Sequence, residues 1–276
     1  MDPYGSERQW YWVGMVVLAL GGFAMLLRSR GKPRDSEPHH VYHIFVCFTA
    51  AIFYLMMAMD QSRVEIPSES RHIYVARFVD WSITTPLLLT ALATTALGEL
   101  RRRNALVVGL LLSDVAIMLT GLAASLSHVQ GAKVAWYVVS CMFQVSVYAL
   151  VWGPLRREAN SQITPTVGGV FARNATILSV LWVAYPLIWL GAPTGFRLYE
   201  APVAALLYMV FDIIAKVIYG FITLAGSSQV EPHSANYRPI VEPIASLPPD
   251  SASGRVGSER ERAHERRELA DMVTRR

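Results

Sequence analysis

The chain has 276 residues, 53% of them hydrophobic, and a mean hydropathy of +0.33. This composition is too apolar for an ordinary soluble domain and indicates a membrane protein. The net charge of +4 is small, and because the basic residues gather between apolar stretches, they do not indicate nucleic-acid binding. The sequence has no metal-ligand cluster, phosphate-binding loop or hydrolase motif, so we expect neither a metal site nor an enzyme.

Seven apolar stretches occupy most of the chain up to residue 226. Each is close to the roughly 20 residues that a helix needs to cross a bilayer. We therefore expect an all-α membrane protein, a bundle of seven transmembrane helices over residues 10–28, 40–59, 74–96, 104–126, 132–153, 172–191 and 201–226. Residues 1–226 would form the membrane domain. Residues 227–276, rich in Ser, Pro, Glu and Arg, are predicted to be a disordered cytoplasmic tail.

Basic residues are distributed unevenly between the two sets of loops. One set holds ten, namely Arg28, Arg30, Lys32, Arg34, Arg101, Arg102, Arg103, Arg156, Arg157 and Arg173. The other side holds five, namely Arg8, Arg63, Arg71, Lys133 and Arg197. Since Lys and Arg favour cytoplasmic loops, the sequence predicts an outside N-terminus and a cytoplasmic C-terminus.

Two polar side chains of the second apolar stretch, His43 and Tyr54, are candidates for a functional role. His43 lies about one turn inside its start. A histidine there is either a solvated helix-end residue or a group that exchanges protons near neutral pH. Tyr54 lies deeper, among apolar residues, and needs a hydrogen-bond partner if it is buried.

The third stretch places Arg77, Asp80 and Thr84 on one helical stripe, because they are three and four residues apart. Polar groups inside a membrane require a hydrated or protein-lined cavity. Asp80 could act as a counterion and proton acceptor, and Arg77 would favour its ionised form. Taken alone, the stripe is also compatible with a helix–helix contact.

The sixth and seventh stretches add an aromatic face and a charged pair. The aromatic face consists of Trp182, Tyr185 and Trp189, beside Pro186. Asp212 and Lys216 are four residues apart and share one helix face. They are either an internal ion pair or a site of covalent chemistry, since a desolvated lysine can form a Schiff base whose protonated form needs a counterion.

Together these residues resemble a microbial (type 1) rhodopsin of the bacteriorhodopsin and proteorhodopsin kind. The resemblance covers about residues 8–226 and is carried by the segments 77–89, 182–189 and 212–216. It implies a seven-helix fold that binds all-trans retinal covalently, as a protonated Schiff base on Lys216.

The resemblance also assigns roles to individual side chains. Asp80 would be the primary proton acceptor, next to Thr84 of the same motif, and Asp212 the second carboxylate of the counterion. Arg77 would be the gating arginine on the outer side. Retinal and its counterion would be surrounded by Tyr54, Trp81, Thr85, Leu88, Asp114, Gly121, Tyr137, Ser140, Cys141, Gln144, Trp182, Tyr185, Pro186 and Trp189.

Two departures from the family pattern concern proton uptake and release. Ala91 stands where efficient pumps carry the carboxylic acid that reprotonates the Schiff base. The family alignment brings His43 beside it, as a cytoplasmic relay or as a mere helix-end residue with protons arriving through water. The outer paired glutamates are replaced at their approximate positions by Thr194 and Ala204, which leaves Glu200 as a release candidate.

The sequence therefore predicts a light-driven outward proton pump in a prokaryotic cell membrane, with the lipid bilayer and protons as partners and a homo-oligomer allowed. Asp80 argues against a chloride pump. The alternative is a sensory photoreceptor rhodopsin that signals to a partner protein, which the absent donor acid favours and Ala215 before the lysine opposes. A seven-helix receptor without retinal is the third reading.

Overall fold

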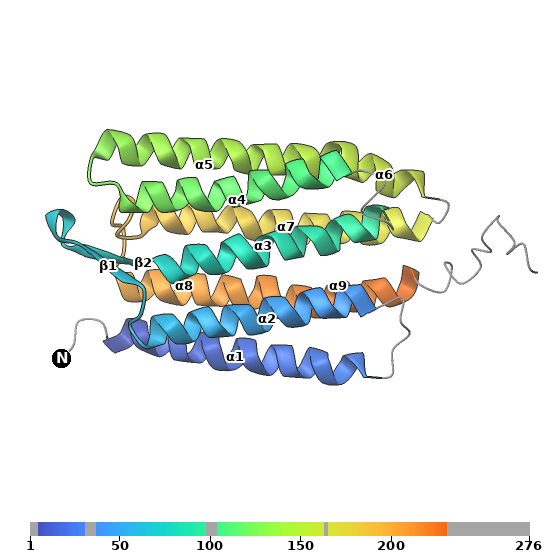
Figure 1. Cartoon of the computed structure of the whole chain (residues 1–276), viewed down its shortest axis with the longest axis horizontal. Helices are drawn as coiled ribbons and strands as arrows, with labels where there is room; N and C mark the ends of the chain where they lie inside the picture. The colour runs from blue at the N-terminus through green and yellow to red at the C-terminus, as the bar shows by residue number, and fades with distance from the viewer. Residues whose placement is uncertain (1–4, 31–36, 98–103, 163–164, 231–276) are drawn as a thin grey trace, which may run out of the picture. The chain divides into compact units, whose positions relative to one another are not determined.

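The computed structural model describes residues 5–30, 37–97, 104–162 and 165–230. In these ranges, long helices lie side by side as a bundle with a short hairpin at one end (Figure 1). The helices are α1 (Gly5–Ser29), α2 (Glu37–Ala58), α3 (Val75–Leu97), α4 (Asn104–Leu126), α5 (Gln130–Leu150), α6 (Arg156–Ser161), α7 (Pro165–Gly191), α8 (Ala201–Ile213) and α9 (Tyr219–Val230).

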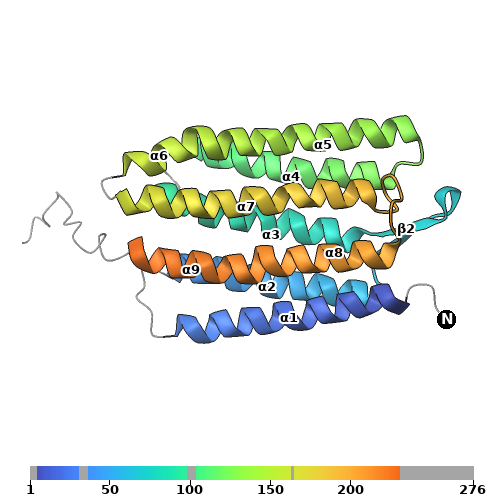
Figure 2. The same ribbon diagram turned by 180° about the vertical axis from the view of Figure 1, so that it is seen from behind.

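Two of the crossings each contain a π-helical segment. Val151–Leu155 joins α5 to α6, and Ile214–Ile218 joins α8 to α9. The nine helices of the described residues therefore make seven crossings, as the sequence predicts. Seen from behind, α8 and α9 form one continuous rod between α7 and α1 (Figure 2).

The helices extend past several of the predicted boundaries. The fifth crossing continues to Ser161 instead of residue 153, and the sixth begins at Pro165 instead of residue 172. A helix satisfies its own backbone hydrogen bonds, so it can continue through the polar membrane interface, where hydropathy no longer marks it. α9 ends at Val230, and residues 231–276 of the predicted tail lie outside the described residues.

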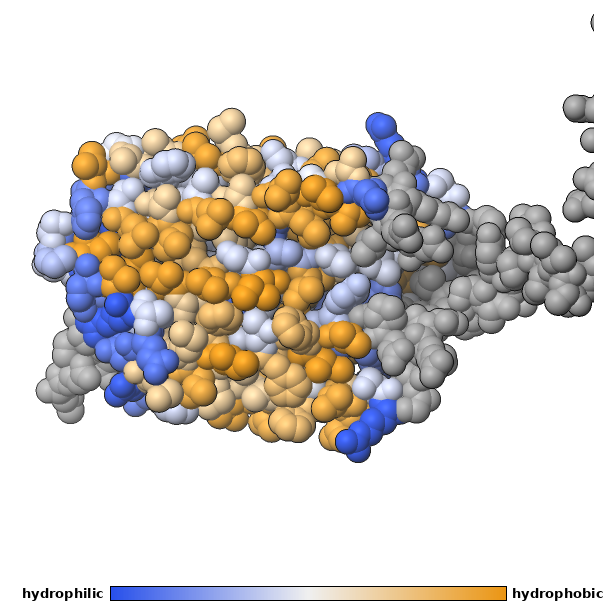
Figure 3. Space-filling view, in the orientation of Figure 1, coloured by the Kyte–Doolittle hydropathy of each residue, from blue (hydrophilic) through white to orange (hydrophobic). Residues whose placement is uncertain are grey.

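Six helices of the described chain are long and apolar enough to cross a membrane, and α3 is the exception. Its polar residues, Arg77 and Asp80 among them, lower its hydropathy, although it packs between α2, α4 and α7. Side chains exposed on the bundle form a broad apolar belt between polar ends (Figure 3). Such a surface suits lipid contact.

A hairpin between α2 and α3 was not anticipated from the sequence. Strand β1 (Arg63–Ile66) pairs antiparallel with β2 (Arg71–Tyr74), with a 3-10 turn over Pro67–Glu69. Four-residue strands offer too little alternation to be distinguished from a polar loop. The hairpin lies at the end of the bundle where α1 begins, which we call the hairpin end (Figure 1).

The carboxylate of Glu69 joins the hairpin to two other segments. It accepts hydrogen bonds from Arg71 Nε at 2.8 Å and from Lys133 Nζ at 2.6 Å, and Arg197 Nη2 donates to the Glu69 carbonyl at 2.8 Å. Burial raises the pKa of Glu69, but the hydrogen bonds from Arg71 and Lys133 outweigh it and lower this pKa to about 2. The cluster therefore holds the hairpin against α5 and the loop 192–200.

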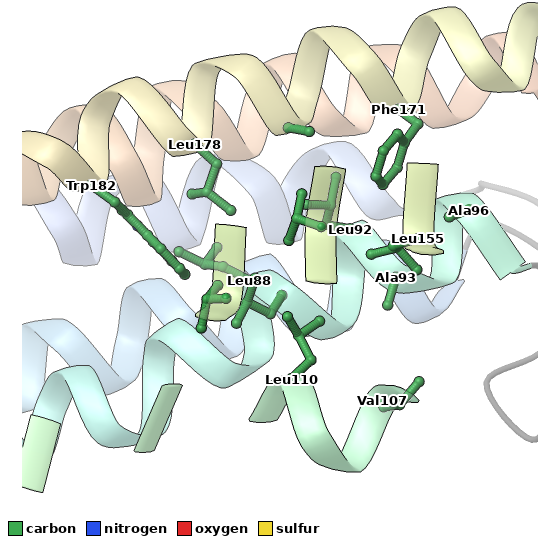
Figure 4. Close-up of a cluster of buried hydrophobic side chains, with 14 of the residues drawn as sticks. Leu88, Leu92, Ala93, Ala96, Val107, Leu110, Leu155, Phe171, Leu178 and Trp182 are labelled. Carbon is green, nitrogen blue, oxygen red and sulfur yellow. The ribbon is translucent and has the colours of Figure 1, made fainter. Parts of the chain in front are cut away.

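The main apolar core lies toward the opposite end, between α3, α4 and α7. Figure 4 shows Phe171, Leu178 and Trp182 of α7 directed toward Leu88 and Leu92 of α3. Ala93 and Ala96 are fully buried and small, which lets the helices approach closely. Within lipid such close packing, and not the exclusion of water, holds helices together.

Candidate functional site

Lys216 and two carboxylates form a fully buried charged cluster in the middle of the bundle. Lys216 Nζ lies 2.5 Å from Asp80 Oδ2 and 3.7 Å from Asp212 Oδ1. The side chains of both aspartates are 0% exposed and that of Lys216 is 2% exposed. The structure thus brings the stripe on α3 and the charged pair on the last crossing to one point, where an amine and its counter-charges are buried together.

The two carboxylates have different surroundings. Asp212 accepts three hydrogen bonds, from Tyr54 Oη at 2.8 Å, Trp81 Nε1 at 3.1 Å and Tyr185 Oη at 2.8 Å. Asp80 Oδ2 accepts one from Lys216, and its buried Oδ1 has no partner among the described residues. Asp212 is therefore satisfied as an anion by neutral donors, whereas Asp80 has an oxygen available for a proton.

A cavity extends from Lys216 toward α5. The space between its walls, including the part open to solvent, is about 810 Å³. Its lining includes every residue of the predicted retinal pocket except Tyr54, which binds Asp212 instead. Sequence reasoning missed five further wall residues, namely Phe78, Ile117, Met118, Tyr208 and Ala215.

Aromatic side chains shape this cavity. Trp189 stacks on Tyr137 with ring centroids 4.8 Å apart, and Trp81 meets Tyr185 edge-on at 5.1 Å. Trp189 Nε1 also donates to Ser125 Oγ at 2.8 Å. A space with such aromatic walls and a primary amine in its lining suits an apolar aldehyde.

Comparison with known proteins identifies the family. A family model described as "Bacteriorhodopsin-like protein" matches residues 5–230. Bacteriorhodopsin from Haloterrigena sp. (strain arg-4) is 33% identical over 231 residues, which cover 82% of this chain and 90% of that protein. The chain belongs to the bacteriorhodopsin-like family.

Other members extend the likeness. The crystal structure of the thermophilic rhodopsin from Rubrobacter xylanophilus is 32% identical, covers 83% of this chain and 100% of that chain, and gives a TM-score of 0.79. The opsin-like protein carO of Fusarium fujikuroi is 29% identical and covers 92% of this chain and 83% of that protein. The chain is thus a multi-pass membrane rhodopsin, and its relatives do not assign a prokaryotic source.

Members of this family bind retinal through a lysine Schiff base, so this rhodopsin is a retinal protein. The site fits that cofactor, because Lys216 faces the cavity and two buried carboxylates can balance a cation on its nitrogen. Lys216 lies in the π-helical segment Ile214–Ile218, and its carbonyl accepts a hydrogen bond from Cys47 Sγ at 3.7 Å. Such π segments are frequent at functional sites.

Thr85 and Asp114 of this rhodopsin form a hydrogen-bonded pair in the cavity wall. Thr85 Oγ1 lies 2.6 Å from the Trp81 carbonyl and 2.7 Å from Asp114 Oδ2. One hydroxyl proton cannot serve both acceptors, so the pair is satisfied when the Asp114 carboxyl donates to Thr85. Asp114 is 0% exposed and lies in α4, remote from the lysine in sequence.

The remaining members of the predicted stripe are Thr84 and Arg77. Thr84 Oγ1 donates to the backbone carbonyl of Asp80 at 2.9 Å. Arg77 Nη2 donates to Tyr11 Oη at 3.0 Å, and its guanidinium lies 4.4 Å from the centroid of the Tyr208 ring. In this rhodopsin the arginine is therefore directed toward the hairpin end, and no ion pair joins it to Asp80 among the described residues.

The predicted uptake and release residues occupy contrasting places. His43 is 0% exposed, packs against the Tyr219 ring with centroids 6.0 Å apart, and has no hydrogen-bond partner for either ring nitrogen among the described residues. Burial excludes the solvated helix-end interpretation. Glu200 is exposed just before α8 and does not line the cavity beside Lys216. Thr194 and Ala204 line a different cavity, together with His72 of the hairpin.

Proposed function

We propose that the protein is a light-driven outward proton pump in which Lys216 carries retinal and Asp80 is the primary proton acceptor. The contact of 2.5 Å between Lys216 Nζ and Asp80 Oδ2 is the observation that supports this proposal most directly. An acceptor within direct hydrogen-bond reach of the nitrogen needs no intervening carrier.

Bound retinal would supply light absorption and an isomerisation that lowers the proton affinity of the Lys216 nitrogen. The chain's own residues then determine the route of the proton. It passes from Lys216 Nζ to the adjacent Asp80 carboxylate, while Asp212 stays ionised because three neutral donors hold its oxygens. The cluster loses charge at Asp80 and keeps it at Asp212.

Arg77 is placed to transmit this change toward the hairpin end. Protonation of Asp80 removes a negative charge one helical turn from Arg77 and weakens the attraction of the guanidinium to the interior. Its hydrogen bond to Tyr11 already leads outward. With the orientation predicted from the basic loops, the hairpin end faces the outside and the pump exports protons across the cell membrane.

The nitrogen of Lys216 must be refilled from the opposite end, where Ala91 cannot carry a proton. We propose His43 as the relay, because its buried ring nitrogens are free among the described residues and imidazole exchanges protons near neutral pH. The competing route is direct delivery through water.

A sensory photoreceptor is the second candidate function, and Ala91 is the observation that favours it. A site without a carboxylic donor is expected to refill slowly, and a long-lived photoproduct suits a signal better than transport. A signalling partner would be required only in that case.

The light-induced pH change of a cell suspension separates the two functions. We expect acidification of the medium that an uncoupler abolishes and that the Asp80→Asn variant lacks. A pigment that forms with retinal but never acidifies the medium contradicts the pump and leaves the sensor.

A further inference from the structure

A second cavity lies between the retinal site and the hairpin. Counted out to its opening, it holds about 500 Å³ of empty space. Its lining includes seven polar or charged side chains, namely Glu7, His72, Tyr74, Arg77, Ser125, Thr194 and Tyr208. Neither the sequence resemblance nor the proposed pump assigns a role to Glu7 or His72.

Glu7 and His72 meet in this cavity as a buried acid–base pair. Glu7 Oε2 lies 3.0 Å from His72 Nε2, and their side chains are 6% and 5% exposed. Such a pair can hold one proton between a carboxylate and an imidazole. It therefore has the chemistry of a group that stores a proton for release.

The pair is connected to Arg77, one helical turn from Asp80, through two hydrogen bonds. Tyr11 Oη donates to Glu7 Oε1 at 2.6 Å and accepts from Arg77 Nη2 at 3.0 Å. Arg77 Nε is buried and has no partner among the described residues, so the guanidinium has a donor left for a new contact. A shift of Arg77 toward Glu7 would favour the ionised carboxylate and expel the shared proton.

The other groups facing the pair leave this assignment in place. Tyr74 packs edge-on against His72 at 5.4 Å but donates its hydroxyl to Asp60 Oδ1 at 2.7 Å. Tyr208 faces Arg77 with its ring, at 4.4 Å from the guanidinium carbon to the ring centroid. Glu7 and His72 are thus the carboxylate and the imidazole of this cavity, and they share a hydrogen bond.

We infer that Glu7 and His72 together form the proton-release group, an inference that rests on the proposed proton pump. One proton moves from the Lys216 nitrogen to Asp80, and a different proton leaves the pair for the outside. The pair is then an ionised Glu7 beside a neutral His72, close to Arg77. Later the proton on Asp80 refills the pair, and the net result is one proton exported per cycle.

Time-resolved release from the purified retinal-loaded protein tests the inference. A pH-indicator dye in weakly buffered solution reports release, while visible absorbance reports deprotonation of the Lys216 nitrogen. We expect wild type to release a proton before it takes one up. In Glu7→Gln, release should be delayed by about tenfold or more and follow uptake, with the absorbance maximum and net pumping retained. His72→Gln should show the same reversed order.

Glu65→Gln is the matched control, because it removes an exposed carboxylate of the hairpin and should leave early release unchanged. Loss of early release in Glu200→Gln but not in Glu7→Gln would assign release to Glu200 and overturn the inference. Early release at the wild-type time in Glu7→Gln, or late release in wild type, overturns the inference. If the variants form no pigment, infrared difference spectra of wild type decide: no glutamate or histidine change at the time of release also overturns it.

The same experiment distinguishes this inference from the proposed function. Early release that depends on Glu7 in the purified protein supports the pair even if cells show no acidification, in which case only the pump fails. Acidifying cells whose release is independent of Glu7 and His72 support the pump and overturn the pair.

Discussion

The two halves of the bundle on either side of Lys216 are built differently. Toward the hairpin, Arg77, Tyr11, Glu7 and His72 form an unbroken series of hydrogen bonds. Toward the opposite end, His43 has no hydrogen-bond partner among the described residues and the neighbouring space is filled by the apolar core. For the proposed pump, this difference predicts that the residues on the outer side of Arg77 are hydrogen-bonded before the cycle begins, whereas the uptake route is not, so uptake should limit the rate.

The largest effect is expected from replacing Lys216, which lies where the two halves of the bundle meet. Lys216→Ala should abolish visible absorbance, because no amine remains in the cavity to bind retinal. Absorption spectra of the purified variant with added retinal measure this. Lys216→Arg is the matched control, since it keeps a buried cation and should likewise stay colourless. Pigment in either variant contradicts the assignment of Lys216.

Removing the negative charge of Asp80, next to Lys216, should impair proton export almost as strongly. In Asp80→Asn the nitrogen loses its acceptor, so proton export should stop and the absorbance maximum should move to longer wavelength. The shift follows because a negative charge near the bound cation stabilises the ground state more than the excited state. Glu65→Gln removes an exposed carboxylate outside the cavity and is the control, with colour and pumping retained. Unchanged colour and retained pumping in Asp80→Asn exclude it as the counterion.

The opposite half is tested at His43. If this side chain relays protons, His43→Ala should slow decay of the deprotonated photoproduct severalfold and leave its formation nearly unchanged, as flash spectroscopy measures. His43→Gln keeps a polar group without imidazole chemistry and should decay as slowly.

The alternative route has its own signature in the same measurement. If protons come directly from water, wild-type decay should slow by about tenfold per pH unit, because the rate then follows the proton concentration. Decay in His43→Ala that matches wild type from about pH 5 to about pH 9 removes His43 from the mechanism.

The smallest expected effect concerns the hairpin. Glu69 has a pKa of about 2 instead of 4.5, so its contribution to stability is complete above pH 4.5 and is lost as pH falls through about 2. Glu69→Gln should lower the thermal midpoint at neutral pH by on the order of 2–4 °C. Thermal loss of visible absorbance measures it. A difference from wild type that stays constant down to pH 3 contradicts this electrostatic origin.

Much of this architecture follows from the sequence alone. Apolar stretches of membrane length predict the seven crossings, since each helix satisfies its own backbone in lipid. The convergence of Asp80 with Lys216 also follows, because an ionisable group in a membrane needs a partner inside the bundle. The family resemblance also predicts which residues line the cavity. Hydropathy and residue spacing alone cannot identify them.

The Glu7–His72 pair could not be predicted in the same way. Both residues belong to segments whose polarity suits solvent, and they are 65 positions apart. Their contact depends on the hairpin, whose strands are too short to be recognised from alternation. The one local signal is the spacing of four between Glu7 and Tyr11, which places a carboxylate and a hydroxyl on one helix face.

The Glu69 cluster has a mechanical consequence. Because one carboxylate ties the hairpin to α5 through Lys133 and to the loop between α7 and α8 through Arg197, three segments are fastened at a single end of the protein. A helix anchored at one end moves most at the other, as a lever does about its pivot. In the proposed cycle we therefore expect α5 and α7 to move further at their ends remote from the hairpin than at their ends beside it.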